Sequence, residues 1–229
     1  MKRETSNKIR FILEELLPPI IRDSFFFTYI IKKLHRSDPL HFDLKKVIFS
    51  SKKNIYKKYY SKPSKIHSAT DLSKKCIDKI HENIKGKKIL DVGCGNGYLL
   101  KTLKNKNLNL NASDIKINHT DKKEFKKFNI SYKEEQINDL KYNKNSFDTV
   151  ICSHTLEHIL EINEAYEKLK NIARHTLIIV IPKERPYEHT FNGHIHFFPY
   201  TWSFINQIKP KNKFKLYEID RDFVFIENK

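Results

Sequence analysis

The sequence predicts an α/β protein with a doubly wound, mostly parallel sheet of seven strands, a C-terminal antiparallel hairpin and a helical N-terminal extension. Three observations predict this class. Short apolar runs alternate with amphipathic segments over residues 68–208, which is typical of a parallel sheet with helices on both faces. A glycine-rich turn follows the first apolar run. Two alternating runs at 214–219 and 222–227 close the chain, and only Asp220 and Arg221 separate them, so they must form an antiparallel hairpin.

The spacing of apolar residues defines the elements in order. A first helix is expected at 68–84, where apolar residues recur at helical spacing. The further helices of this part are expected at 97–104, 121–127, 160–173 and 201–208, the last with Thr201 as its cap. The strands before the hairpin are expected at 87–92, 108–114, 129–133, 147–153 and 176–182.

The N-terminal part has a different pattern. Residues 7–17 place their apolar side chains on one helical stripe, and two prolines end this helix. Residues 20–34 form a second apolar segment that is too short, and too charged at its start, to cross a bilayer. It is interpreted as a lid packed on the domain or as a helix in a membrane interface, and apolar residues on all its sides favour the lid. We therefore expect an extension at 1–66 and a domain at 67–229.

The amino-acid composition limits which binding partners and which cell compartment can be expected. The 229 residues include 44 Lys and Arg against 27 Asp and Glu, but only seven are Arg, so the charge resembles the amino-acid usage of an AT-rich genome more than a phosphate-recognising surface. Eight Lys and no acid fall within 44–70, where a solvated surface is favoured over an anionic partner. Three Cys and no secretory signal predict a cytoplasmic protein, with a membrane-peripheral location as the alternative.

Three of the five glycines lie in DVGCGNG (91–97), between a strand and a helix. Glycine permits positive φ and close approach of a ligand, and the N–H groups of a helix start attract anionic groups. A dinucleotide fingerprint would need glycine where Tyr98 stands, and the Lys-Ser/Thr ending of a P-loop is absent. The pattern that remains is D-x-G-x-G-x-G after a strand.

LDVGCGNGYLL (90–100) resembles the first motif of the class I S-adenosylmethionine-dependent methyltransferases, and the resemblance extends over most of 68–229. It implies a Rossmann-like fold, S-adenosyl-L-methionine as cofactor and S-adenosyl-L-homocysteine as product. By the same resemblance, the cofactor-binding residues are Asp91, Gly93, Cys94, Gly95, Gly97, Asp114, Gln136, Ser153 and His154.

Three of these roles follow from matching positions. Asp114 ends the second strand, where the family binds the ribose hydroxyls, and a carboxylate can accept from both of them. Gln136 stands where the family commonly has an acid beside the adenine amine, with Glu135 and Asp139 as alternatives. The segment 146–159 resembles the fourth-strand motif, whose end lies near the methionine part of the cofactor.

Histidines after the fourth and fifth strands are candidates for acid–base chemistry. Methyl transfer depends on positioning the acceptor and excluding water, and a histidine suits removal of the acceptor proton. His194 is the first candidate base, followed by His158 and His196, although each could instead bond a backbone carbonyl in a loop. His194-x-His196 has no paired acid at helical spacing, so no metal site is expected.

The acceptor is predicted only by class. Residues 16–34 resemble the leading segment of methyltransferases from bacterial surface-polysaccharide biosynthesis. This favours transfer to an O or N atom of a small molecule, a sugar or a phosphate-bearing glycan precursor. The alternatives are an RNA or protein methyltransferase that docks its substrate on the Lys-rich 44–65, and a non-catalytic cofactor-binding subunit. The oligomeric state is left open.

Overall fold

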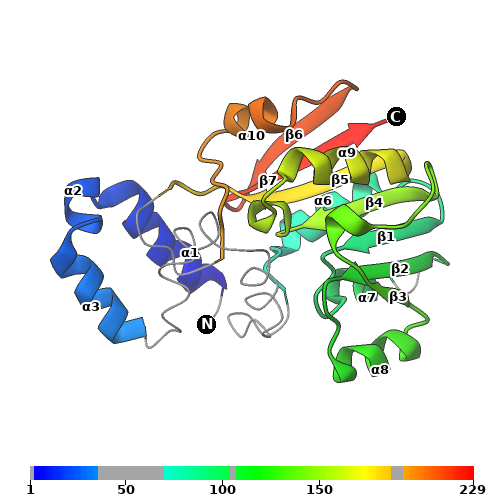
Figure 1. Ribbon diagram of the computed structural model, residues 1–229, viewed down its shortest axis with the longest axis horizontal. Helices are drawn as coiled ribbons and strands as arrows, with labels where there is room; N and C mark the ends of the chain where they lie inside the picture. The colour runs from blue at the N-terminus through cyan, green and yellow to red at the C-terminus, as the bar shows by residue number, and fades with distance from the viewer. Residues whose placement is uncertain (1–2, 36–69, 104–106, 187–192) are drawn as a thin grey trace.

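A computed structural model describes residues 3–35, 70–103, 107–186 and 193–229 (Figure 1). The basic segment 44–65 and the expected domain boundary at 66/67 lie outside these residues.

Seven strands form one sheet in the order β3-β2-β1-β4-β5-β7-β6. Their bounds are β1 (Lys88–Val92), β2 (Asn109–Asp114), β3 (Ser131–Glu134), β4 (Phe147–Ser153), β5 (Ala173–Pro182), β6 (Phe214–Ile219) and β7 (Asp222–Asn228). The first five strands are parallel, and β7 pairs antiparallel with both β5 and β6. The predicted fold class is therefore confirmed.

The order of the strands reverses at β1, which pairs with β2 on one side and with β4 on the other. In an open α/β sheet a ligand binds beyond the carboxyl ends of the strands at such a point. The turn after β1 is therefore the place to look for a site.

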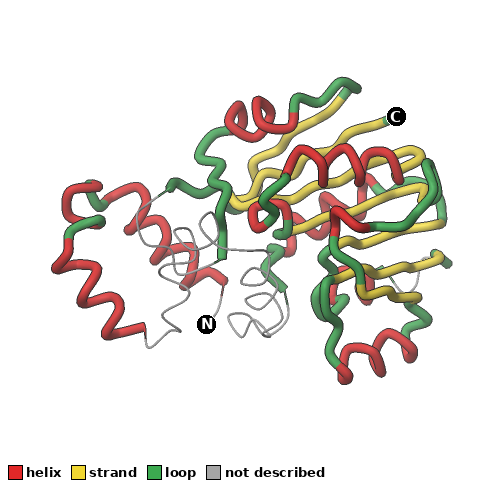
Figure 2. Tube along the Cα trace, viewed as in Figure 1, coloured by secondary structure: helices red, strands yellow, loops and turns green. Residues whose placement is uncertain are grey.

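Helices lie on both faces of the sheet (Figure 2). Within the domain they are α6 (Lys74–Asn83), α7 (Tyr98–Thr102), α8 (His119–Lys127), α9 (Ile162–Ile172) and α10 (Thr201–Ile208). Alternate side chains of a strand enter opposite apolar layers: in β5, Leu177 packs in the layer of α9 and α10, whereas Ile178 packs in the layer of α6, α7 and α8. Both side chains are fully buried.

The start of α6 and the cap of α10 differ from the prediction, and the other helix starts agree with it within two residues. Helix α6 begins at Lys74 rather than at residue 68, because the Ser73 side chain accepts a hydrogen bond from the N–H of Cys76 at 3.2 Å and caps the helix there. Thr201 is the first residue of α10 and not its cap, which is Tyr200.

The terminal hairpin turns at Asp220 and Arg221, as predicted. Their φ angles of 48° and 66° are both left-handed, which a two-residue turn needs to match the twist of its strands. The register pairs Ile219 with Asp222 directly across this turn.

The N-terminal helices are α1 (Arg3–Phe11), the π-helix η1 (Ile12–Leu16), α2 (Pro19–Arg22) and α3 (Phe25–His35). Large apolar side chains on them are exposed, with Ile20 at 84% and Phe25 at 87%. Contact with the domain is made instead by polar groups: Arg10 donates to the backbone oxygen of Lys183 at 3.0 Å. No helix among the described residues is long and apolar enough to cross a membrane. Both interpretations of the extension, a lid or a membrane-surface contact, stay predictions.

Candidate active site

The turn after β1 is built from three glycines with left-handed backbones. The φ angles of Gly93, Gly95 and Gly97 are 73°, 53° and 71°. A Cβ at Gly93 would overlap the Thr155 side chain, and one at Gly97 would overlap the Phe125 ring, whereas one at Gly95 would have no neighbour within 4 Å. Two glycines thus serve close packing against neighbouring elements, and the middle one borders open space.

Asp114 lies beside this turn, where the sequence predicts it. Its Oδ2 accepts a hydrogen bond from the Gly95 N–H at 2.8 Å, and its Oδ1 accepts one from the Lys116 N–H at 3.4 Å. Burial raises the pKa of this carboxyl above its usual range. The carboxylate therefore joins the turns that follow β1 and β2, at the strand ends where a nucleoside would lie.

Asp91 lies beneath the turn and is only 1% exposed. Its Oδ1 accepts no hydrogen bond from the described residues. Burial, with the neighbouring charge of Asp114, raises the pKa of Asp91 to about 8. A buried acceptor without a partner is costly, so this atom can receive an N–H or a cationic group of a ligand. Cys94 is also buried, and burial raises the pKa of its thiol well above the usual value, so it is protonated and not a nucleophile.

The segment after β3 contains the predicted adenine contacts. Gln136 is half-buried and precedes the short helix η2 (Ile137–Asp139), while Asp139 is exposed. The N–H of Glu135 donates to the backbone oxygen of Asp114 at 2.9 Å, and Glu135 Oε2 is buried without a hydrogen-bond partner among the described residues. Glu135 thus has an acceptor available next to the end of β2.

Ser153 and His154 end β4, close to the glycine turn. Ser153 is half-buried. His154 has a left-handed φ of 48°, and its N–H donates to the backbone oxygen of Val180 at 2.8 Å. Its ring lies between Glu157 and Asp222, with contacts of 3.5 and 3.6 Å. Burial opposes the charge of this ring, but the two carboxylates raise the pKa of His154 to about 10. The ring is therefore a cation enclosed by acids.

A second histidine cluster joins the ends of β4 and β5. Glu157 and His158 lie in the short helix η3 (Leu156–His158), and His194 follows β5. The rings of His158 and His194 have their centroids 4.7 Å apart. Nδ1 of His158 lies 3.0 Å from the Gly193 oxygen, and Nδ1 of His194 contacts the Glu184 carboxylate. Burial and His194 lower the pKa of His158 to about 4, so its ring is neutral near neutral pH.

His196, the third candidate base, is placed differently. Its Nε2 lies 2.7 Å from the Ile159 oxygen, which is the backbone bond given as the alternative for each histidine. The N–H groups of Ile195 and His196 donate to the backbone oxygen of Glu157 at 2.9 and 3.1 Å. The structure therefore brings His158 and His194 together and leaves His196 outside this pair, although His158 and His196 both contact a backbone carbonyl.

Glu157 and Glu184 were missed by the sequence analysis. Both are at most 1% exposed, and both contact His194. The available signal was their position: Glu157 directly precedes His158, and Glu184 follows β5 by two residues. An acid at a strand end beside a histidine is a candidate for a functional group.

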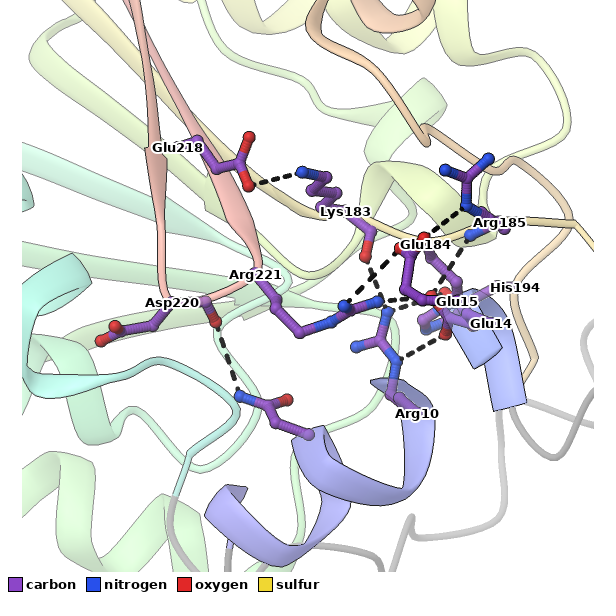
Figure 3. A network of polar contacts seen from close by, with 11 residues as sticks. Arg10, Glu14, Glu15, Lys183, Glu184, Arg185, His194, Glu218, Asp220 and Arg221 are labelled. Carbon is purple, nitrogen blue, oxygen red and sulfur yellow. Dashed lines mark hydrogen bonds and ion pairs between the residues drawn. The ribbon is translucent and has the colours of Figure 1, made fainter. Parts of the chain in front are cut away.

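The N-terminal helices contact this cluster through charged side chains (Figure 3). Arg10 lies 3.0 Å from Glu14 and 3.8 Å from Glu184. Arg221, in the hairpin turn, lies 2.6 Å from the same Glu14. A continuous polar network therefore runs from the first helix to His194.

Residues 90–180 match a family described as the methyltransferase domain. The match includes the glycine turn, Asp114 and the whole of β4. The match covers 91 of the 229 residues and supports methyltransferase activity. A comparison with curated proteins found no match.

Solved structures share the fold of this chain. An S-adenosylmethionine-dependent methyltransferase from Aquifex aeolicus superposes with a TM-score of 0.55 at 16% identity, over 78% of this chain and 99% of that one. A protein from Pyrococcus horikoshii gives 0.57 at 13% identity, over 86% and 98%. Magnesium protoporphyrin IX methyltransferase from Synechocystis, with bound S-adenosylhomocysteine, gives 0.50 at 15%, over 68% and 82%. At these identities the likeness establishes the fold.

The glycine turn yields a test with a matched pair of variants. Gly95→Ala and Gly97→Ala both place a side chain on a left-handed backbone, at a cost of about 1–2 kcal/mol. Only Gly97→Ala also overlaps the Phe125 ring, which adds roughly 1–3 kcal/mol. We expect Gly97→Ala to lower the free energy of unfolding by more than Gly95→Ala in urea titrations. Equal losses would mean that the Phe125 contact does not require glycine.

Proposed function

We propose that this methyltransferase transfers a methyl group from S-adenosylmethionine to an O or N atom of a small molecule, a sugar or a phosphate-bearing glycan precursor. The observation that carries the proposal is the contact between two sites. Thr155 packs against Gly93 of the cofactor turn, and the next residues along the chain lead to the Glu157, His158 and His194 cluster. A cofactor on the turn and an acceptor at the cluster would therefore be neighbours.

On the cofactor side, the residues present fit S-adenosylmethionine. The proposal gives Asp114 the ribose hydroxyls, the unpaired Oδ1 of Asp91 a cationic or N–H group, and the open space at Gly95 the body of the ligand. The same proposal keeps the predicted cofactor-binding roles of Cys94, Ser153, His154 and Gln136. When bound, this cofactor supplies an electrophilic methyl group on a positively charged sulfur.

On the acceptor side, a hydroxyl or protonated amine must lose a proton. His194 is the first candidate to take it, because the Glu184 carboxylate contacts Nδ1 and orients the ring. Arg185 follows Glu184 in the chain and keeps 38% of its side chain exposed while it pairs with Glu15 at 2.9 Å. It supports an acceptor that carries phosphate. The RNA and protein alternatives depend on 44–65, which the structure does not describe, so no observation favours them.

A turnover assay tests the acceptor class. Release of S-adenosylhomocysteine would be followed with nucleotide-linked sugars, free sugars and transfer RNA as acceptors, each at low and at high salt. We expect turnover with a nucleotide-linked sugar and none with RNA. Turnover with RNA that falls steeply with salt would favour the alternative, because contacts with many phosphates depend strongly on salt. Cofactor binding without turnover on any acceptor would favour a binding subunit.

Cofactor affinity tests the role of Asp114. The Asp114→Asn variant keeps one oxygen for the Gly95 N–H but loses a charged acceptor, so S-adenosylhomocysteine should bind more weakly by roughly 1.5–3 kcal/mol, or about 10–100-fold in Kd. Asp78→Asn, at an exposed position on α6, is the control and should bind normally. Calorimetry gives both values, and an unchanged affinity in Asp114→Asn would exclude the ribose role.

Proton release tests Asp91. With a pKa of about 8 in the free protein, this carboxyl is mostly protonated near pH 7. A ligand cation favours the carboxylate, so binding of S-adenosylmethionine should release up to about one proton near pH 7 and less above pH 8. Affinity should rise with pH over the same range. Calorimetry in two buffers of different ionisation enthalpy counts the protons. The release should be lost in Asp91→Asn; release of the same size in that variant would place the titrating group elsewhere.

A further inference from the structure

The histidine cluster has the composition and connections of a metal-binding site. One nitrogen from each of His158 and His194 and one oxygen of Glu157 lie within 4.8 Å of one another. Two imidazoles and a carboxylate are the protein ligands of many catalytic zinc centres, in which another position stays open. No sequence spacing indicated this set, because 35 residues separate His158 from Gly193, which precedes His194.

The second nitrogen of each ring is held as in metal centres. A ligating histidine usually contacts a backbone oxygen or a carboxylate through its other nitrogen, which fixes the ring and the tautomer. Nδ1 of His158 contacts the Gly193 oxygen at 3.0 Å, and Nδ1 of His194 contacts the Glu184 carboxylate. Both contacts assign Nε2 as the ligating atom of each ring.

The buried carboxylate of Glu157 gives an independent indication of a cation site. Its side chain is fully buried, and neither carboxylate oxygen accepts a hydrogen bond from the described residues. The nearest ring nitrogens are Nδ1 of the charged His154 at 3.5 Å and Nε2 of His194 at 3.9 Å, and both distances are longer than hydrogen bonds. A buried carboxylate in this state is costly unless a cation reaches it.

We propose that Glu157, His158 and His194 bind one divalent transition-metal ion of the zinc class. Two ligands of such an ion lie roughly 3.4 Å apart for bonds of about 2.1 Å, so the ligand atoms, now within 4.8 Å of one another, would move closer by at most about 1.4 Å. His158 and His194 are half-buried, which leaves access for an oxygen or nitrogen of the acceptor. The inference rests on the proposed function in that the ion would bind the acceptor of the methyl group. His194 would then act as a metal ligand and not as the proton acceptor.

Metal content tests the proposal directly. The full-length protein would be stripped with a chelator, dialysed against Zn²⁺ or Co²⁺, and analysed for bound metal and for the visible absorption of Co²⁺. We expect one ion per chain in the wild type, and a loss of at least 10-fold in affinity in Glu157→Gln and in His194→Ala. His175→Ala, at an exposed histidine outside the cluster, is the control and should bind as the wild type does.

A variant of Glu184, which positions His194, distinguishes loss of metal binding from a failure to fold. Glu184→Gln leaves all three ligands in place but weakens the hold on Nδ1 of His194, so the metal affinity should fall roughly 10–100-fold with the Co²⁺ spectrum retained at saturation. No stoichiometric metal in the wild type, or equal binding in His194→Ala and the wild type, overturns the proposal. S-adenosylhomocysteine binding to the stripped protein separates the two ideas. If the protein binds S-adenosylhomocysteine but no metal, only the metal site is overturned. If it does not bind S-adenosylhomocysteine, the proposed function is overturned.

Discussion

Burial of carboxylates at the carboxyl edge of the sheet is the constraint on which the site depends. Four of them are at most 1% exposed: Asp91, Glu157, Glu184 and Asp222. A charge removed from water costs several kcal/mol unless a partner or a proton compensates it. The compensation is uneven. His154 lies between Glu157 and Asp222, whereas Asp91 keeps an oxygen without a partner among the described residues and has a raised pKa. The oxygens without a hydrogen bond from the described residues include Oδ1 of Asp91, before the glycine turn, and both carboxylate oxygens of Glu157 in the histidine cluster, where ligands are proposed.

The N-terminal helices take part in the same charge balance. Glu14 is buried, and burial raises its pKa although Arg10 and Arg221 lower it. Arg221 can reach Glu14 because the two-residue turn of the hairpin fixes its left-handed backbone beside α1 and η1. Arg10 in turn lies 3.8 Å from Glu184, the partner of His194. Removal of this extension would thus change the electrostatics of the acceptor side, even though its apolar side chains are exposed and contribute little packing to the domain.

The sequence predicted what local patterns determine. Alternating apolar residues predicted the strands within three residues of their bounds, and the rule that parallel strands end at one edge placed Asp114 beside the glycine turn. The histidine cluster could not be predicted in this way. His194 meets His158 only because the chain after β5 returns to the turn after β4, where the Ile195 N–H donates to the backbone oxygen of Glu157. Such a contact joins distant residues and leaves no periodic signal in the sequence.

Electrostatics supports the proposed cation at the histidine cluster, where the methyl acceptor is proposed to bind. Burial alone would raise the pKa of Glu157, but the charged His154 ring at 3.5 Å and the neighbouring histidines lower it, so the group is ionised. An acceptor oxygen that develops negative charge beside this carboxylate would be repelled, and the repulsion is strong where water is excluded. A proton on His194 offsets part of it. A divalent ion held by Glu157, His158 and His194 would reverse the local sign and attract the acceptor oxygen. Glu157, whose carboxylate alone would repel the acceptor oxygen, would then hold the ion that binds this oxygen.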